Sequence, residues 1–254
     1  MIGQLRIVWA LVRRALNEIL RVPGAAVPGV LAPTIFMLGM TGIFGKAVGL
    51  PGYGTDNFLT FVLPVGMLQG AGFTGAATGV NLARDMEQGL FDRLRIAPVK
   101  QLTLLGGIVL SASFRVLIPA TCLLIVGLIF GVHWPGVLGV LIAYLLVTGL
   151  AALSACWGTI VALKFKSQQA APLMQVGSFV AVLFTTAYAP QDLLTGWLAT
   201  FARINPVTHV LDGVRQGFVG GVTWGKTWPA FVALIGLLIL FAALALRGLA
   251  RADR

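Results

Sequence analysis

Six long apolar runs limit what this 254-residue chain can fold into more than any other feature. Each run has roughly 18 residues or more, enough to cross a hydrocarbon core of about 30 Å as a helix. Hydrophobic residues make up 58% of the chain and charged residues only 10%, far fewer than in a soluble domain. The sequence therefore predicts an all-α integral membrane protein with six transmembrane helices. We place these at Ala25–Gly45, Phe58–Val80, Leu102–Phe130, Val137–Leu163, Ala170–Ala189 and Pro229–Leu246.

The formal net charge of +10 raises the question of a nucleic acid partner. Sorted by the predicted spans, however, thirteen basic residues fall on one side of the membrane and four on the other, with Arg115 inside the third span. Cytosolic loops of membrane proteins carry such an excess of Lys and Arg. The distribution predicts a multi-pass protein of the plasma (inner) membrane with both termini in the cytosol, and it removes the nucleic acid interpretation.

Residues 1–22 have the pattern of an amphipathic helix. Leu5, Val12 and Ile19 fall on one helical side, whereas Arg13 and Arg21 belong to a group of polar residues opposite them. Such a helix lies along the inner leaflet, with its apolar side in the headgroup boundary and its arginines at anionic lipid. The alternative is a basic anchor with no further role.

The second span is rich in glycine. Its Gly66/Gly70 and Gly75/Gly79 pairs have the small-xxx-small spacing that lets helix backbones approach closely. We interpret these pairs as helix packing positions, with a flexible hinge as the less favoured alternative.

Residues 190–228 are too polar to cross lipid and too numerous for a simple loop. Leu193 to Phe201 have the spacing of one short amphipathic helix, Asn205-Pro206 turns the chain, and Val207–Val219 has the pattern of a second helix. The segment therefore predicts an outer helical hairpin that dips into the outer leaflet before the last span.

Enzyme chemistry finds little support in the residues. Gly220–Thr227 satisfies the literal Walker A pattern, but a P-loop needs a preceding strand and a following soluble helix, and this copy precedes a membrane span. Cys122 and Cys156 lie in apolar spans, where cysteine acts as a small hydrophobe. The histidines and acids form no triad, dyad or metal-binding set. We expect no catalytic, cofactor-binding or metal-binding residue in this chain.

Arg115 is a basic residue within the third apolar run. A charge facing lipid at the bilayer centre costs roughly 2.5 kcal/mol or more, so the side chain should face protein or water. It is either a pathway or gating residue, or it snorkels from a helix that begins deep in the cytosolic interface.

The segment EQGLFDRLRIAP, Glu87 to Pro98, places four charged residues between two apolar runs. Its acids interleave with arginines at helical spacing, which indicates an ion-paired docking surface. We interpret residues 81–101 as a cytosolic contact element for a soluble partner.

These features together resemble the ABC-2 type permeases, the membrane subunits of ATP-driven exporters, over nearly the full chain. The Glu87–Pro98 segment is similar to a loop of the daunorubicin-resistance type of exporter. Asn205–Arg215 is similar to that group's Asn-Pro-x-Thr stretch followed by Asp and Arg. The residues that carry the resemblance are Gly89, Asp92, Arg93, Arg95 and Pro98 in the loop, Asn205, Pro206, Thr208, Asp212 and Arg215 in the hairpin, and Arg115 at a basic position of the third helix.

The resemblance implies that the whole chain, residues 1–254, is a single ABC-2 type transmembrane domain. It would be half of a transporter that pairs with a second permease copy, identical or homologous, and with two cytosolic ATPase subunits that bind the ATP and Mg²⁺. Glu87 and the five loop residues would couple this chain to the ATPase, while the second span's glycines and residues 1–22 would form the contact between the two permeases.

The cargo would be a hydrophobic or amphipathic compound, either a drug or lipid-like, moved out of the cell. Few buried charges are available in the spans to satisfy an ionic cargo. A polysaccharide or lipid-linked glycan exporter is the alternative with the same architecture. A stand-alone secondary carrier is less favoured, because no acid falls within a predicted span.

Overall fold

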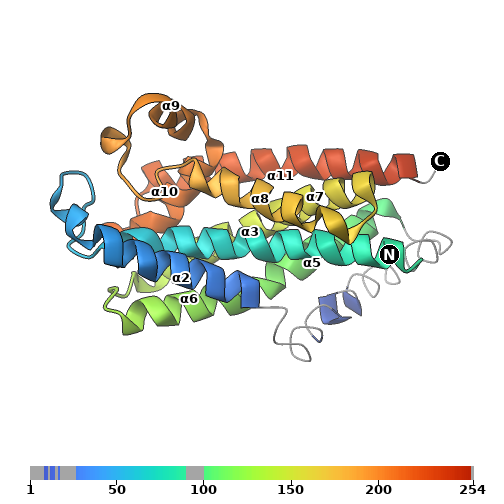
Figure 1. Ribbon diagram of the computed structural model, residues 1–254, viewed down its shortest axis with the longest axis horizontal. Helices are drawn as coiled ribbons and strands as arrows, with labels where there is room; N and C mark the ends of the chain where they lie inside the picture. The colour runs from blue at the N-terminus through green and yellow to red at the C-terminus, as the bar shows by residue number, and fades with distance from the viewer. Residues whose placement is uncertain (1–8, 11, 15–16, 18–26, 90–99, 253–254) are drawn as a thin grey trace.

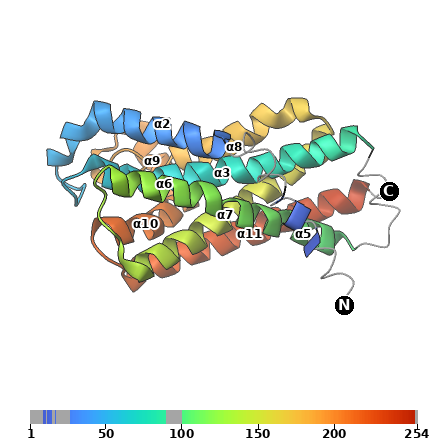
Figure 2. The same ribbon diagram turned by 90° about the horizontal axis from the view of Figure 1, so that it is seen from below.

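The computed structural model describes residues 9–10, 12–14, 17, 27–89 and 100–252, and across these ranges the chain is helical with no strand. Long helices lie side by side in one bundle (Figures 1 and 2). The α-helices are α2 (Val27–Phe44), α3 (Phe58–Glu87), α5 (Gln101–Arg115), α6 (Leu117–Ile129), α7 (Gly136–Phe165), α8 (Ala171–Leu183), α9 (Gly196–Ile204), α10 (Pro206–Val219) and α11 (Trp224–Ala252). Short 3-10 helices occur at η2 (Gly45–Gly49), η3 (Gln168–Ala170) and η4 (Gln191–Leu193).

The bundle has two distinct ends (Figure 1). At one, called the basic end, α3, α7 and α11 finish and α5 begins. At the other, called the hairpin end, lie η2, α9 and α10. Successive long helices run from one end to the other in alternation, which is the arrangement expected of a multi-pass membrane protein.

Five helices of the described residues are long and apolar enough to cross a membrane, and they agree with five of the six predicted spans. The transmembrane helix predicted at Ala170–Ala189 is not among these five. The five are Gly29–Gly49, Phe58–Glu87, Gln101–Ile129, Gly136–Phe165 and Trp224–Arg251.

The predicted fifth span, Ala170–Ala189, is the exception. Its helix, α8, has 13 residues and covers about 20 Å, short of the roughly 30 Å of a hydrocarbon core. Beyond Leu183 the chain continues to Pro190 without helix. Apolar composition continues through this stretch, so hydropathy alone does not reveal where the helix stops.

The third span also departs from a straight helix. It consists of α5 and α6, which meet at Val116. Pro119 has no N–H to donate to the Arg115 carbonyl four residues earlier, so the helical ladder is interrupted there.

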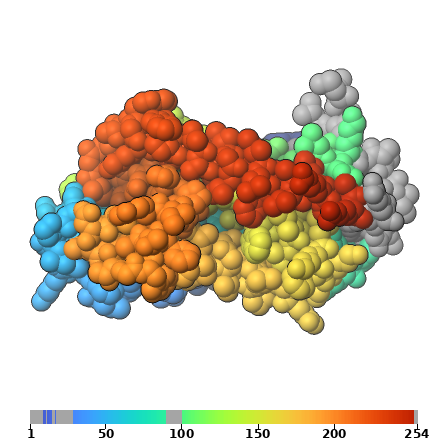
Figure 3. All heavy atoms as spheres, turned by 90° about the horizontal axis from the view of Figure 1, so that it is seen from above, coloured from blue at the N-terminus to red at the C-terminus, as the bar shows by residue number. Residues whose placement is uncertain are grey.

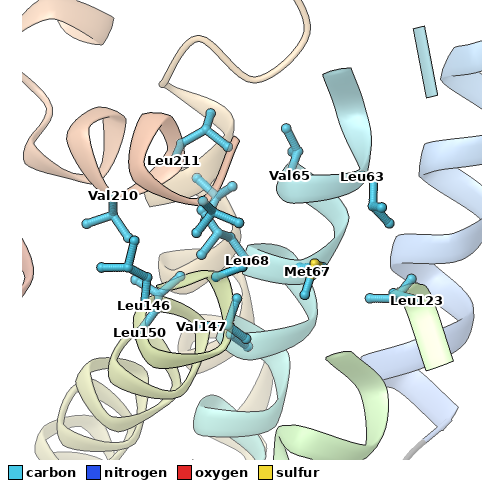
Figure 4. Packing of buried hydrophobic residues seen from close by; sticks show 14 of the residues in the cluster. Leu63, Val65, Met67, Leu68, Leu123, Leu146, Val147, Leu150, Val210 and Leu211 are labelled. Atoms are coloured by element: carbon cyan, nitrogen blue, oxygen red, sulfur yellow. The ribbon is translucent and has the colours of Figure 1, made fainter. Parts of the chain in front are cut away.

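Helix α3 is the centre of the bundle. In its most apolar stretch, 89% of the residues are buried, against 11% for the first span. Figure 4 shows Leu68 and Met67 of α3 between side chains of α6, α7 and α10. Helix α3 contacts α2, α5, α6, α7, α8 and α10, so most of the bundle packs around it.

The glycines of α3 are packing positions, as predicted. A Cβ added at Gly75 would collide with the Ala151 carbonyl of α7, and one at Gly79 would lie 2.5 Å from Gly158. At Gly70 it would lie 2.8 Å from the Gly29 carbonyl of α2. These contacts are within one chain, so the expectation that these glycines form the contact between two permeases is wrong. Outward-facing apolar side chains come instead from other helices, including α11, which spans the face seen in Figure 3.

The predicted hairpin helices are present as α9 and α10. Of the two, α9 exposes apolar side chains, including Trp197 and Phe201. Helix α10 packs on the bundle and buries Val210 and Leu211 against α3 and α7 (Figure 4).

Candidate functional site

At the basic end, Glu87 joins the last turn of α3 to the turn between α7 and α8. Its carboxylate accepts hydrogen bonds from the Ser167 hydroxyl at 2.8 Å, from the Gln168 backbone N–H at 2.9 Å and from the Gln168 side-chain amide at 2.5 Å. Both carboxylate oxygens take part. We call this group of three residues the Glu87 clasp.

The turn that carries Ser167 and Gln168 has a defined local geometry. Helix α7 ends at Lys166, which adopts the left-handed conformation with φ of 51°. Ser167 is extended, and its hydroxyl oxygen accepts from the Gln169 N–H, which caps η3. The chain then runs without a break from η3 into α8. The clasp therefore holds the very start of α8.

Of the other predicted ATPase-coupling residues, the structure describes one and leaves out four. Gly89 ends α3 with a φ of +67°, a conformation that suits glycine at a helix C-terminus. Asp92, Arg93, Arg95 and Pro98 lie outside the described residues.

A second contact at the basic end involves the N-terminal region. Arg14 and Asp85 form an ion pair at 3.0 Å, in which the Arg14 side chain is 57% exposed. The described residues between 9 and 17 are helical, with Val12 buried and Arg13 exposed. The rest of the predicted interfacial helix, residues 1–22, is outside the part that the structure describes.

At the hairpin end, Asn205 closes the end of α8. Its side-chain amide donates to the Ala181 carbonyl at 2.8 Å and to the Phe184 carbonyl at 2.9 Å. Its side-chain oxygen accepts from the Val207 N–H at 2.9 Å and so caps α10. One side chain therefore serves a helix C-terminus and a helix N-terminus together.

Pro206 and Thr208 continue the same connection. Pro206 is the first residue of α10, where its fixed φ suits a helix start and no N–H is needed. The Thr208 hydroxyl donates to the Ala202 carbonyl of α9 at 2.6 Å. These residues fix α9 relative to α10.

Arg215 holds the non-helical stretch that follows α8. Its guanidinium donates to the Thr186 carbonyl at 2.9 Å and to the Ala187 carbonyl at 3.1 Å. It also donates to the Thr186 hydroxyl and to the Phe61 carbonyl of α3, and it lies 3.7 Å from the Phe61 ring centroid. Non-helical backbone at membrane depth is tolerated only where its polar groups find partners in the protein. Arg215 supplies those partners.

Arg215 is buried, and Asp212, 3.9 Å away and three residues earlier on the same helix, is its acidic neighbour.

Two more side chains complete the support of this stretch. The Tyr53 hydroxyl donates to the Tyr188 carbonyl at 3.3 Å, and Gln69 of α3 donates to the Tyr188 hydroxyl at 3.1 Å. We call Asn205, Arg215, Tyr53 and Gln69 the α8 lock. Our sequence analysis did not select Tyr53 or Gln69, because their partner is more than one hundred residues away and no local pattern points to it.

A pocket of about 390 Å³ opens beside the lock. Its lining includes Asp192, Asp212, Arg215 and Lys226, two acids and two bases. The lining has no net charge, so it does not by itself select the charge of a ligand.

The Walker-like segment has a structural role. Helix α10, not a strand, precedes it, and α11 begins inside it at Trp224. Gln216 accepts from the Thr223 N–H at 2.9 Å and donates to the Thr227 hydroxyl at 2.8 Å. These bonds set the turn between α10 and α11, and the arrangement does not resemble a phosphate-binding loop.

Arg115 lies inside the bundle. It is the last residue of α5, and the residue is 4% exposed. Since α5 begins at Gln101, the helix rises about 20 Å before it reaches Arg115. This is not the surface position that snorkelling requires. Within the described ranges, no group of three or more His, Cys, Asp or Glu side chains is placed to hold a metal ion.

Residues 6–219 match the model of the family described as ABC-2 type transporter. The chain belongs to the ABC-2 type transporter family. It is a membrane permease, a class that lacks catalytic activity, and the ATPase that works with it is a separate subunit.

Curated relatives agree with this assignment. The chain is 23% identical over 236 residues to the daunorubicin resistance ABC transporter permease protein DrrB1 of Streptomyces coeruleorubidus, covering 92% of this chain and 82% of the relative. It is 24% identical over 221 residues to the probable doxorubicin resistance permease protein DrrC of Mycobacterium tuberculosis, covering 85% and 75%. It is 25% identical over 164 residues to the probable multidrug permease YbhR of Escherichia coli, covering 61% and 43%.

Proposed function

We propose that this permease moves a hydrophobic or amphipathic compound, a drug or a lipid-like molecule, out of the cell. The observation that carries the proposal is the similarity to DrrB1 over 92% of the chain, since the printed name of that relative concerns daunorubicin resistance. The spans fit such a cargo. Among the described residues, the only acids within the five long helices are Asp85 and Glu87, both in the last turn of α3.

The position of Asp85 and Glu87 in the last turn of α3 disfavours a stand-alone secondary carrier. Carriers coupled to ions generally place ionisable residues near the membrane midplane. In the described spans the acids stand at the basic end instead. An external energy source, the ATPase of an ABC transporter, suits this permease better.

We propose that the basic end faces the cytosol and the hairpin end faces outward. The excess of basic residues at the basic end supports this orientation. Cysteines introduced at exposed Lys166 and Thr195 would test it in intact cells with a membrane-impermeant thiol reagent. Labelling at position 195 alone is the expected result, and labelling at position 166 alone would reverse the proposed orientation.

We also propose that two permease copies, identical or homologous, assemble with two ATPase subunits. Support for this comes from the resemblance of the chain to half-transporters. Co-purification of two differently tagged permease copies with the ATPase would establish the assembly. Recovery of only one permease per complex would contradict it.

Inside-out vesicles that contain the permease and its ATPase would test the cargo. We expect ATP-dependent accumulation of daunorubicin, and no accumulation when the phosphate-binding lysine of the ATPase is substituted. Daunorubicin uptake without any ATPase would favour a secondary carrier. ATP-driven movement of a lipid-linked glycan, with none of daunorubicin, would favour the glycan exporter.

A further inference from the structure

We propose that Glu87 is a positioning residue that attaches α8 to the end of α3, so that movement at the basic end is carried along α8 to the hairpin end. This inference rests on the proposed function, since it assigns Glu87 a part in ATP-driven transport. The part differs from direct contact with the ATPase, which the charge of Glu87 suggested in the sequence.

The Glu87 carboxylate is already occupied. Ser167 and Gln168 together direct three hydrogen bonds to its two oxygens, although the side chain is exposed. A carboxylate in this state has little capacity left for a docking partner. Its partners show instead that it acts within the chain.

Glu87 lies where α3 meets the connection to α5. It is the last residue of α3, the most buried of the long helices, and the chain leaves α3 here for residues 90–99. A displacement applied to that connection reaches the C-terminal end of α3, where Glu87 lies. Through Gln168, which opens η3, it reaches the first residues of α8.

The opposite end of α8 is held as well. There Asn205 binds the Ala181 and Phe184 carbonyls, and Arg215 binds the backbone of the stretch that follows. Helix α8 is thus held by side chains at both ends. Between them it lies close to α3, where a Cβ added at Gly72 would be 3.1 Å from Ser178.

A helix fixed at both ends transmits displacement as a rigid body. In this arrangement, a shift of the connection after α3 moves the start of α8, and α8 carries the shift to α9 and α10 through the lock. The clasp is the exposed member of this series of contacts. Its loss would separate the basic end from α8 while leaving the buried lock intact.

Two chemically matched variants separate this role from docking by charge. In Glu87→Gln, the amide oxygen still accepts from Ser167 and the Gln168 N–H, and the amide nitrogen can donate to Gln168 once that side chain turns over. The variant therefore removes the charge and keeps the clasp. Ser167→Ala combined with Gln168→Ala removes the side-chain partners and keeps the charge.

The measurement is daunorubicin transported per ATP hydrolysed in vesicles that contain the permease–ATPase complex. We expect Glu87→Ala and the Ser167→Ala/Gln168→Ala double variant each to lower this ratio by at least about fivefold, the scale of a coupling free energy between sites. ATPase binding and basal ATP hydrolysis stay unchanged. Glu87→Gln and the control Asp85→Ala, an acid at the same end with another partner, remain within about twofold of wild type.

Several results would overturn the inference. One is a Glu87→Gln variant as impaired as Glu87→Ala while the double variant transports normally, which would show that the charge matters and the clasp does not. Another is Glu87→Ala losing its ATPase when the double variant keeps it. A third is a normal ratio in every variant. Failure of the wild-type complex to transport would count against the proposed function instead, so the two failures are distinguishable.

Discussion

The two ends of the bundle hold α8 in different ways. At the hairpin end, the α8 lock is built from Arg215 and Gln69, which are buried, and from side chains that bond to backbone carbonyls. At the basic end, the Glu87 clasp and the Arg14–Asp85 pair each join an exposed side chain, Glu87 or Arg14, to half-buried partners. The contacts at the hairpin end are therefore mostly in the interior, and those at the basic end are at the surface.

This difference indicates which end can change during transport. A buried hydrogen bond cannot be replaced by water when it breaks, so the lock is costly to open. Exposed pairs exchange readily with solvent and contribute little free energy. We infer that the lock keeps α8 and the hairpin together throughout, whereas the basic end is where an applied displacement enters the bundle.

The largest effect should come from the lock. Arg215→Met leaves the Thr186 and Ala187 carbonyls without their donor in a buried site, which should destabilise the protein by roughly 3 kcal/mol. Thermal unfolding in detergent would report this through a thiol-reactive dye, because Cys156 is fully buried in the native fold. Arg215→Lys keeps the charge but not the planar guanidinium with its several donors. Its unfolding temperature should therefore fall between those of wild type and Arg215→Met. Unchanged unfolding of Arg215→Met would show that the lock does not hold this end.

Asn205 should give the next largest effect. Asn205→Ala removes both donations to α8 and the cap of α10, at a cost of about 1–2 kcal/mol. Asn205→Asp keeps the capping oxygen but places a carboxylate oxygen, an acceptor, against the Ala181 and Phe184 carbonyls in place of the amide donor, so it should destabilise the protein at least as much as Asn205→Ala. If Asn205→Asp unfolds like wild type, the cap alone accounts for the stabilisation, and the lock loses one of its members.

The smallest effect should come from the basic end. Asp85→Ala breaks the ion pair with Arg14, in which the Arg14 side chain is exposed and the Asp85 side chain is half-buried, and should change stability by less than about 0.5 kcal/mol. The difference should shrink further in 1 M salt, where charges are screened within about 3 Å. A loss comparable to that of Asn205→Ala would contradict the contrast between the two ends.

Sequence reasoning was most successful where a local pattern decides the structure. Apolar runs placed five spans, and the Asn205-Pro206 turn placed α9 and α10. The small-xxx-small pairs of α3 were correctly identified as packing positions, but their partners were not. A glycine pattern shows that something approaches closely, not whether it belongs to the same chain.

The predicted fifth span, Ala170–Ala189, is not one continuous helix, and the reason is physical. The residues from Phe184 to Ala189 are apolar enough for a helix, and a helix would be the default in lipid. Arg215 and Asn205, which lie twenty residues or more further on, offer these carbonyls alternative hydrogen bonds. The outcome depends on a contact that forms only in the folded bundle, so no window of sequence contains it.

The candidate site shows the same division. Asn205 and Arg215 were selected from a motif, and the structure assigns them contacts. Glu87 was selected for its charge, but its partners Ser167 and Gln168, eighty residues away, were not. Sequence therefore identifies residues that matter more readily than it identifies what they bind.

The central claim is that this chain is a conduit moved by a separate ATPase that acts at its basic end. The most direct measurement is ATP hydrolysis and daunorubicin transport in proteoliposomes that contain the purified permease, with and without its ATPase. We predict neither activity from the permease alone and both from the complex. Hydrolysis of ATP by the permease alone, or transport that proceeds equally well without the ATPase, would contradict the account.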